Sequence, residues 1–238
     1  MQSFTAAIGE AMGLIVSFDD ALMEIIMLSL KVSLSAVLIA AIVGLPAGAW
    51  LAVTRSRWRS VWITLVSTLM GLPPVVVGLV VYLLLSNAGA LGPLQLLYTP
   101  TAMIIAQSIL VTPILIALTR ETLSGLNEVY HEQFVLLGLG TRARLLTLLW
   151  EGRHGLLTAL LAGFGRAIAE VGAVIIVGGN INHVTRVMTT TIALETSKGN
   201  LALALGLGII LVAMALMVNL LVLLLGGSMR RQVSAHGV

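Results

Sequence analysis

Two residues of opposite charge, Arg166 and Glu170, stand four positions apart in an otherwise apolar stretch of this 238-residue chain. Positions i and i+4 lie on one face of a helix, so the two side chains can pair. A charged side chain in the middle of a membrane costs about 2.5–3.5 kcal/mol, and such residues therefore pair or face a cavity. We favour a structural or gating ion pair over direct contact with an anion. Glu170 would repel an anion, and Arg166 alone would hold one too tightly to release it.

Three prolines in apolar segments, Pro73, Pro74 and Pro113, form a second candidate set. Each removes a backbone N–H from the helical hydrogen-bond ladder. One interpretation is a fixed kink. The other, which we prefer slightly, is a bend that lines or gates a path, where the freed backbone groups face water or a solute.

Enzyme chemistry is not predicted. The chain has no Gly-x4-Gly-Lys-Ser/Thr loop for phosphates and no cysteine. Its four histidines lack the spacing of metal ligands. We therefore expect no catalytic residue, no metal and no cofactor.

Composition indicates a membrane protein. Hydrophobic residues make up 58% of the chain and charged residues 10%, against about 25% charged in soluble domains. The mean hydropathy is +1.07. There is too little polar surface to face water, and the 13 Lys and Arg residues are too scattered for a nucleic-acid partner.

Five apolar stretches reach the length of about 20 residues that a transmembrane helix needs. They run approximately over Leu22–Val53, Val61–Leu85, Thr101–Leu118, Leu156–Val177 and Leu201–Gly226. The first is long enough to tilt, and its Gly44, Pro46 and Gly48 would let the helix bend and another helix approach closely. The expected fold is an all-α bundle of about five transmembrane helices.

Basic residues follow the first, third and fifth stretches, which by the positive-inside rule places the N-terminus outside and the C-terminus inside. We expect an external or interfacial segment over 1–20, a transmembrane domain over 21–227 and a cytoplasmic tail over 228–238. Residues Thr5–Phe18 would form an amphipathic interfacial helix or a frayed terminus. The sequence does not predict a removable signal peptide.

A cytoplasmic loop is expected over about 120–155, which is long for a compact bundle. Glu121–Gly125 should continue the third helix and end at the glycine. Glu132–Leu137 should be helical and stop at Gly138 and Gly140. Thr141 is then the expected N-cap of a second piece that ends at Trp150, with Arg142 and Arg144 exposed. The loop is either a docking element for a cytoplasmic partner or a solvated hairpin.

This loop resembles the one in permease subunits of binding-protein-dependent ABC importers, which reads Glu-Ala-Ala, three residues, Gly, nine residues, then an apolar-x-Leu-Pro ending. Here Glu132, Gln133 and Phe134 take the opening triplet, and Gly138 has the required spacing. The ending departs from the pattern, with Trp150-Glu151 in place of Leu-Pro. The resemblance implies that this loop couples to the ATPase, with contacts from Glu132, Arg142 and Arg144.

A second resemblance, over about Leu28–Leu225, is to tungstate and molybdate permeases. It rests on the stretches 71–79, 163–173 and 177–181, while Thr189–Asn200 is most similar to the tungstate branch. It implies a type I ABC importer permease in the inner membrane: a homodimer with two separate ATPase subunits and an external oxyanion-binding protein. Tungstate is the expected cargo; molybdate or another oxyanion is the alternative.

Passage of an oxyanion needs weak binding by uncharged donors at several points. The candidates share a position in or beside the spans: Ser67, Thr68, Gln107, Ser108, Thr112 and Asn180. Each could instead make a helix–helix hydrogen bond. The path and gate candidates are thus Pro73, Pro74, Thr112, Pro113, Arg166, Glu170 and Asn180.

Two other classes remain open. A stand-alone channel or secondary transporter would commonly show inverted repeats, and none is evident here. An intramembrane enzyme would need a nucleophile and a base, and no such pair can be placed.

Overall fold

The computed structural model describes residues 4–17, 19–54 and 56–235, which form helices and no strand. The chain divides into two compact units. Unit 1 comprises Met1–Ala36, Pro73–Ser108 and Gly165–Met217, and unit 2 comprises Val37–Leu72, Ile109–Phe164 and Val218–Val238. Each unit is assembled from segments that are far apart in the sequence.

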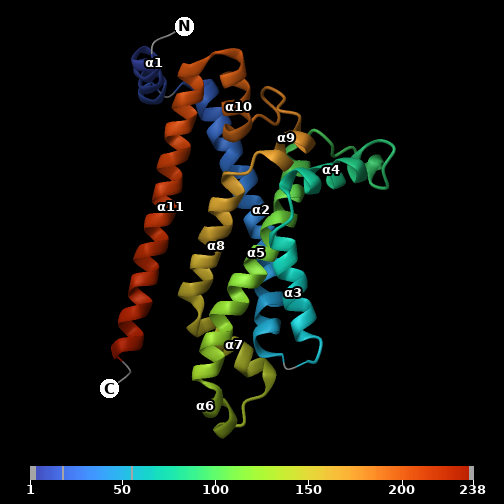
Figure 1. The fold of residues 1–238 in the computed structure, drawn as a ribbon, viewed down its shortest axis with the longest axis vertical. Coiled ribbons are helices and arrows are strands. Elements are labelled where there is room, and N and C mark those ends of the chain that lie inside the picture. The colour runs from blue at the N-terminus through green and yellow to red at the C-terminus, as the bar shows by residue number, and fades with distance from the viewer. Residues whose placement is uncertain (1–3, 18, 55, 236–238) are drawn as a thin grey trace. The chain divides into compact units, whose positions relative to one another are not determined.

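Three helices are long and apolar enough to cross a membrane: α2 (Asp20–Val53), α5 (Pro100–Val129) and α11 (Leu201–Ala235), the last tested over Leu201–Leu224. Two pairs of helices interrupted by a bent break also pass this test. They are α3 (Arg59–Met70) with α4 (Pro74–Leu85), and α8 (Arg153–Ile168) with α9 (Gly172–Gly178). Counting each pair once gives the five predicted spans, three continuous and two broken (Figure 1).

The prolines act differently from one another. Pro73 is the N-cap and Pro74 the first residue of α4, so the predicted kink or bend is a full break between two helices, which meet at 93°. Pro113 lies inside α5, which continues to Val129. The α5 helix therefore runs eleven residues past Leu118, where the predicted apolar stretch ends.

The remaining helices are short. They are α1 (Phe4–Val16), η1 (Gly92–Leu94), α6 (His131–Leu136), α7 (Thr141–Glu151) and α10 (Met188–Lys198). In α1, Ala11 is fully buried, and its carbonyl lies 3.6 Å from where a Cβ on Gly206 of α11 would be. The N-terminal segment is thus a packed helix rather than a frayed end from Phe4 onward.

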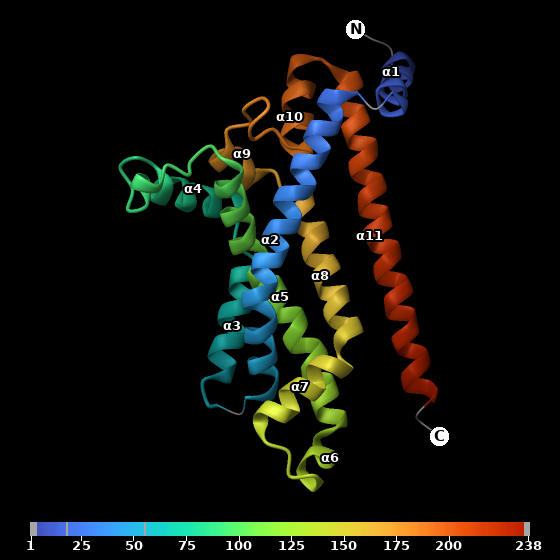
Figure 2. The same ribbon diagram turned by 180° about the vertical axis from the view of Figure 1, so that it is seen from behind.

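In unit 1, α4 packs directly on α9, as both ribbon views show (Figures 1 and 2). A Cβ built on Gly78 of α4 would lie 2.8 Å from the Cα of Ala173 in α9. Only glycine allows this approach, and the contact joins the second part of one broken span to the second part of the other.

In unit 2, α2 and α5 make the close crossing that the glycines predicted. A Cβ on Gly44 would lie 2.8 Å from Leu115 Cβ, and one on Gly48 would lie 2.6 Å from both Ile116 O and Thr119 Cβ. The core continues in a buried cluster of Ala49, Ala52, Leu123, Phe134, Leu148 and Leu156. This cluster ties the short helices α6 and α7 to α2, α5 and α8.

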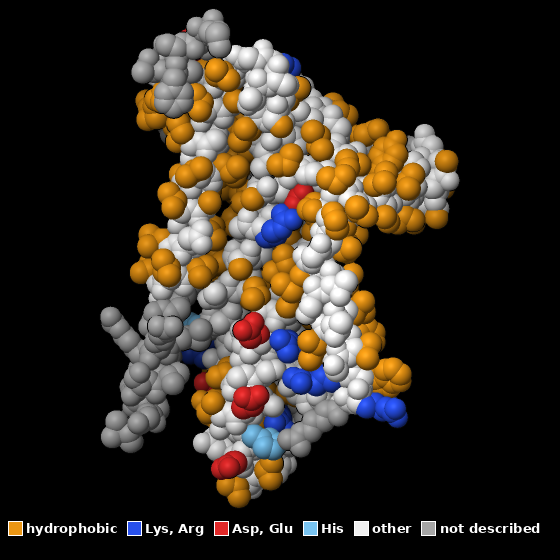
Figure 3. Space-filling model, viewed as in Figure 1, with side chains coloured by type: hydrophobic (Ala, Val, Ile, Leu, Met, Phe, Trp, Pro, Cys, Tyr) orange, Lys and Arg blue, Asp and Glu red, His pale blue; other side chains and the backbone are white. Residues whose placement is uncertain are grey.

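Much of the apolar surface is exposed. Only 11% of the most apolar stretch of α11 is buried, and the side chains of Leu216, Leu220 and Leu223 are exposed. Charged side chains gather over the end of α5 and over α6 and α7, whereas α4 is covered with hydrophobic ones (Figure 3). An apolar helix surface of this extent suits contact with lipid or with another membrane protein.

Candidate functional site

The charged pair lies at a break in the fourth span. The sequence placed Arg166 and Glu170 on one continuous helical face, but α8 ends at Ile168 and α9 begins at Gly172, so Glu170 is in the break. The pair still forms, with Arg166 Nη1 2.5 Å from Glu170 Oε2. Continuity of the helix was the wrong part of the prediction, and pairing was the correct part.

Side chains replace the backbone hydrogen bonds that the break removes. Gln107 Nε2 of α5 donates to Ala167 O at 3.0 Å, and Thr189 Oγ1 of α10 donates to Glu170 O at 2.8 Å. Glu170 Oε1 accepts from the N–H of Ala173 at 3.2 Å, which satisfies a free donor of α9. A broken helix is tolerated in a membrane when its freed groups find such partners.

The two charges differ in exposure. The Glu170 side chain is 5% exposed and the Arg166 side chain 39% exposed. A small cavity of about 10 Å³ beside Glu170 is also lined by Ser29, Ser33 and Gln107. Because Glu170 is buried and already bonded, Arg166 is the member of the pair that could meet a solute anion.

The predicted uncharged donors are mostly occupied. Ser108 Oγ donates to Ile104 O at 2.7 Å and lies 3.3 Å from Ala36 O, and Thr68 Oγ1 donates to Thr64 O at 2.9 Å. Asn180, in a left-handed conformation with φ of 51°, accepts from Thr190 Oγ1 at 2.9 Å. Thr112 is half-buried in α5, and Ser67 is exposed on α3. The hydrogen bonds of Gln107, Ser108 and Asn180 favour the helix-joining interpretation for these three.

A second buried carboxylate, Glu195 of α10, lies between the fourth and fifth predicted spans, on the side that the predicted orientation places outside. Lys198 Nζ donates to its Oε1 and Asn200 Nδ2 to its Oε2, both at 3.0 Å. The ammonium of Lys198 is the main cause that lowers the pKa of Glu195, against the opposing effect of burial. Sequence reasoning missed this cluster, because an i,i+3 pair beside a glycine looks like an ordinary helix end.

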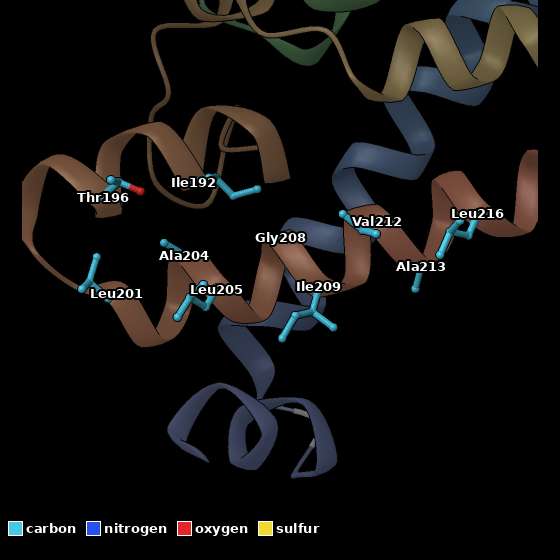
Figure 4. A pocket seen from close by; sticks show the side chains of 10 residues that line it. All are labelled: Ile192, Thr196, Leu201, Ala204, Leu205, Gly208, Ile209, Val212, Ala213 and Leu216. Atoms are coloured by element: carbon cyan, nitrogen blue, oxygen red, sulfur yellow. The ribbon is translucent and has the colours of Figure 1, made fainter. Parts of the chain in front are cut away.

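An apolar groove of about 700 Å³ lies between α10 and the first part of α11 (Figure 4). The residues that line it are small or aliphatic except for Thr196, which carries the one hydroxyl. They are Ile192, Thr196, Leu201, Ala204, Leu205, Gly208, Ile209, Val212, Ala213 and Leu216. Such a lining offers no set of donors to an oxyanion, so the groove is not a candidate for the path.

The predicted cytoplasmic loop is helical, with two corrections. The α5 helix passes through Gly125 and ends at Val129, so this glycine does not stop it. The N-cap of α7 is Gly140 rather than Thr141, and no side chain caps the helix. Gly138 has a φ of +60° just after α6, as expected of a helix-stopping glycine.

The loop residues divide into anchors and exposed positions. Phe134 is 5% exposed and belongs to the buried cluster, whereas Glu132, Gln133 and Arg142 are exposed. Arg144 was expected to be exposed but is half-buried. Its Nε donates to Asn127 Oδ1 at 2.6 Å, and its Nη2 lies 2.9 Å from His131 Nδ1.

The guanidinium of Arg144 also lies 5.3 Å from the centre of the Phe134 ring. Arg144 therefore holds α5, α6 and α7 together instead of facing outward. Three neighbouring apolar side chains of α6 and its end were missed by the sequence analysis: Val135, Leu136 and Leu137, which are 64%, 86% and 71% exposed. These three residues form an apolar run in a segment predicted to lie outside the membrane, and this run could have identified them from the sequence.

Residues 44–233 match the family described as the inner membrane component of binding-protein-dependent transport systems. The match covers most of the chain, and the chain belongs to this family. It is a multi-pass membrane protein and a transport subunit.

Curated relatives point in the same direction. A probable anion ABC transporter permease protein of Haloferax volcanii is 43% identical over 206 residues, covering 84% of this chain and 88% of that protein. The tungstate uptake system permease protein TupB of Peptoclostridium acidaminophilum is 41% identical over 209 residues, covering 88% and 92%. The molybdenum transport system permease protein ModB of Azotobacter vinelandii is 27% identical, covering 70% and 77%.

Proposed function

We propose that this chain is the permease subunit of an ATP-driven tungstate importer. The observation that carries the proposal is the 41% identity to a tungstate permease across 88% of this chain and 92% of that relative. A second tungstate permease, from Campylobacter jejuni, is 38% identical over 155 residues. Molybdate is the second candidate cargo, supported by the 27% identity to a molybdenum permease.

The protein works as a homodimer in this proposal, and Arg166 supports it. The guanidinium belongs to a broken span and keeps 39% of its side chain exposed. A charged group turned toward hydrocarbon would be costly, so this surface is expected to face protein or water. A second copy of the chain would supply that cover, with the anion passing between the two copies.

Near the break, Arg166 attracts the oxyanion while Glu170 limits how tightly it is held. Conduction needs binding that is strong enough for entry and weak enough for release. A guanidinium already paired with a carboxylate at 2.5 Å meets both needs. The gate itself would involve the two breaks, at Pro73–Pro74 and at Glu170, because a broken helix can bend without disrupting a continuous ladder.

The ATPase subunits would dock on α6. Its exposed Val135, Leu136 and Leu137 form an apolar patch beside the exposed Glu132 and Gln133. Buried apolar anchors with a polar rim are the usual anatomy of a protein interface. Arg144 and Phe134 keep this patch in position, so movement of the ATPase reaches α5 and α8 through a rigid loop. ATP-driven closure would then alternate access to the path.

The test is copurification of a candidate ATPase subunit, with the wild-type chain and with the Leu136→Glu variant. The Leu136 side chain is 86% exposed, so the variant should fold normally but place a charge in the interface. We expect the retained ATPase to fall about tenfold or more. The matched control is Leu94→Glu, which is 58% exposed in the segment predicted to lie outside. It should retain the ATPase like wild type.

Cargo is assigned by anion-stimulated ATP hydrolysis in proteoliposomes that contain the permease, the ATPase and the binding protein. Stimulation by tungstate at lower concentration than by molybdate or sulfate is expected. If molybdate alone stimulates ATP hydrolysis, molybdate rather than tungstate is the cargo. In the copurification test, an equal loss of ATPase in both leucine variants would count against α6 as the docking site.

A further inference from the structure

A polar pocket of about 250 Å³ lies in unit 2, where α2 ends and α3 begins, against the last turns of α5. Its charged and amide-bearing lining residues are Arg59, Asn127 and Glu128. The hydroxyls of Thr54, Ser56 and Ser124 also line it. Neither the oxyanion path nor the docking patch on α6 uses these groups.

Its donors remain available to a ligand. Nε of Arg59 donates to Leu51 O at 3.0 Å, which fixes the guanidinium and leaves its Nη groups as the remaining donors. Asn127 accepts from Arg144 through Oδ1, so its Nδ2 is the group left for another partner. Ser124 Oγ has no hydrogen-bond partner among the described residues, but it is buried and lies out of reach of a ligand.

The same pocket holds one carboxylate. Glu128 is exposed and makes no ion pair with another described residue. A pocket with a guanidinium and hydroxyls and also a free carboxylate suits a ligand that carries both a phosphate and a cation. A purely anionic ligand would be repelled by Glu128.

The surroundings indicate a membrane interface. Trp58 and Trp62, on either side of Arg59, are 60% and 47% exposed, and the guanidinium of Arg57 lies 5.8 Å from the Trp58 ring centre. Exposed Val61 and Leu65 follow on α3. Exposed tryptophan beside basic residues at the end of a span is typical of the headgroup level, and the apolar side chains beyond it suit acyl chains.

We propose that this pocket binds the headgroup of an ethanolamine phospholipid, with the phosphate on Arg59 and the ammonium on Glu128. Asn127 lines the pocket and also accepts the hydrogen bond from Arg144. A lipid in the pocket therefore braces the end of α5 from which the ATPase-docking loop departs.

The test is native mass spectrometry of the full-length chain in detergent, with equal amounts of phosphatidylethanolamine and phosphatidylglycerol added. Wild type should retain the ethanolamine lipid about three- to fivefold better, the size expected for one exposed ion pair. Glu128→Gln should remove this preference while total lipid retention stays similar. Glu121→Gln changes an exposed carboxylate two turns earlier on α5 and should keep the wild-type preference.

Arg59→Gln is a second variant, which removes the guanidinium proposed to hold the phosphate. It should lower retention of both lipids about fivefold. Inorganic phosphate at matched concentration separates a lipid site from a free-anion site. Displacement of the lipid by phosphate, or an unchanged preference in Glu128→Gln, overturns the proposal. So does loss of ATPase from Glu128→Gln without any change in lipid retention, which would make the pocket part of the ATPase interface.

Discussion

At the scale of single residues, Glu170 does more than balance a charge. One carboxylate oxygen pairs with Arg166, and the other accepts the N–H of Ala173 at the start of α9. Its own carbonyl accepts from Thr189. The residue thereby joins the end of one helix, the start of the next and α10, and the break depends on all three bonds.

Glu170→Gln keeps an acceptor for the Ala173 N–H but leaves Arg166 without its counter-charge. We expect unfolding in detergent to become easier by about 1–3 kcal/mol, since Arg166 is partly exposed and the loss is smaller than for a fully buried pair. The double variant Arg166→Met/Glu170→Gln should regain most of this stability, because no unpaired charge remains. Thermal unfolding monitored by circular dichroism measures the stability of the single and the double variant.

Transport separates the structural role from the functional one. If Arg166 attracts the anion, the stable double variant should still lose most tungstate uptake. A double variant that is both stable and fully active would show that the pair only joins helices.

At the scale of elements, close helix packing depends on glycine. A Cβ built on Gly48 of α2 would lie 2.6 Å from the backbone oxygen of Ile116 in α5. In a membrane, where no hydrophobic force holds helices together, such close approach is a main source of association.

Gly48→Leu should therefore separate α2 from α5 and lower the yield of monodisperse protein severalfold, since backbone rather than a flexible side chain must move. Gly125→Leu is the matched control, because nothing lies within 4 Å of its Cβ position in α5. Size-exclusion chromatography after detergent extraction compares the two. Similar profiles for both variants would mean that the crossing tolerates a shift and is not tightly packed.

At the scale of the whole molecule, the orientation in the membrane is still a prediction from the basic residues. The chain has no cysteine, so a single introduced thiol reports its side without background. Ser197 of α10 and Thr147 of α7 are both exposed and lie in segments predicted to face opposite sides.

Ser197→Cys should react with a membrane-impermeant maleimide in spheroplasts. Thr147→Cys should react only after the membrane is opened, in cells that lack the ATPase so that docking does not shield it. Labelling is read by gel shift. The reverse pattern would invert the predicted topology and move α6 to the outside, where no ATPase could reach it.

Composition and apolar run lengths alone predicted an all-α membrane protein with about five spans, because the cost of burying charge and backbone in lipid leaves few other arrangements. Three long helices and two bent helix pairs fit this prediction. The spacing of Gly44 and Gly48 predicted a helix crossing, and the proline pair predicted a kink or bend, which in the structure is a break between two helices. Local sequence could do this because both effects arise from a residue's own backbone chemistry.

Only the tertiary structure decided which polar groups are used up and which stay free. Gln107, Thr189 and Glu170 come from distant segments, and they meet only when α5 and α10 pack at the α8–α9 break. Arg144 looked exposed in the sequence, yet it is held by Asn127 and His131. The pocket with Arg59 and Glu128 likewise exists only because α5 runs on past Gly125. Hydrogen bonding between remote residues has no period or spacing in the sequence, so these contacts could be seen only in the folded chain.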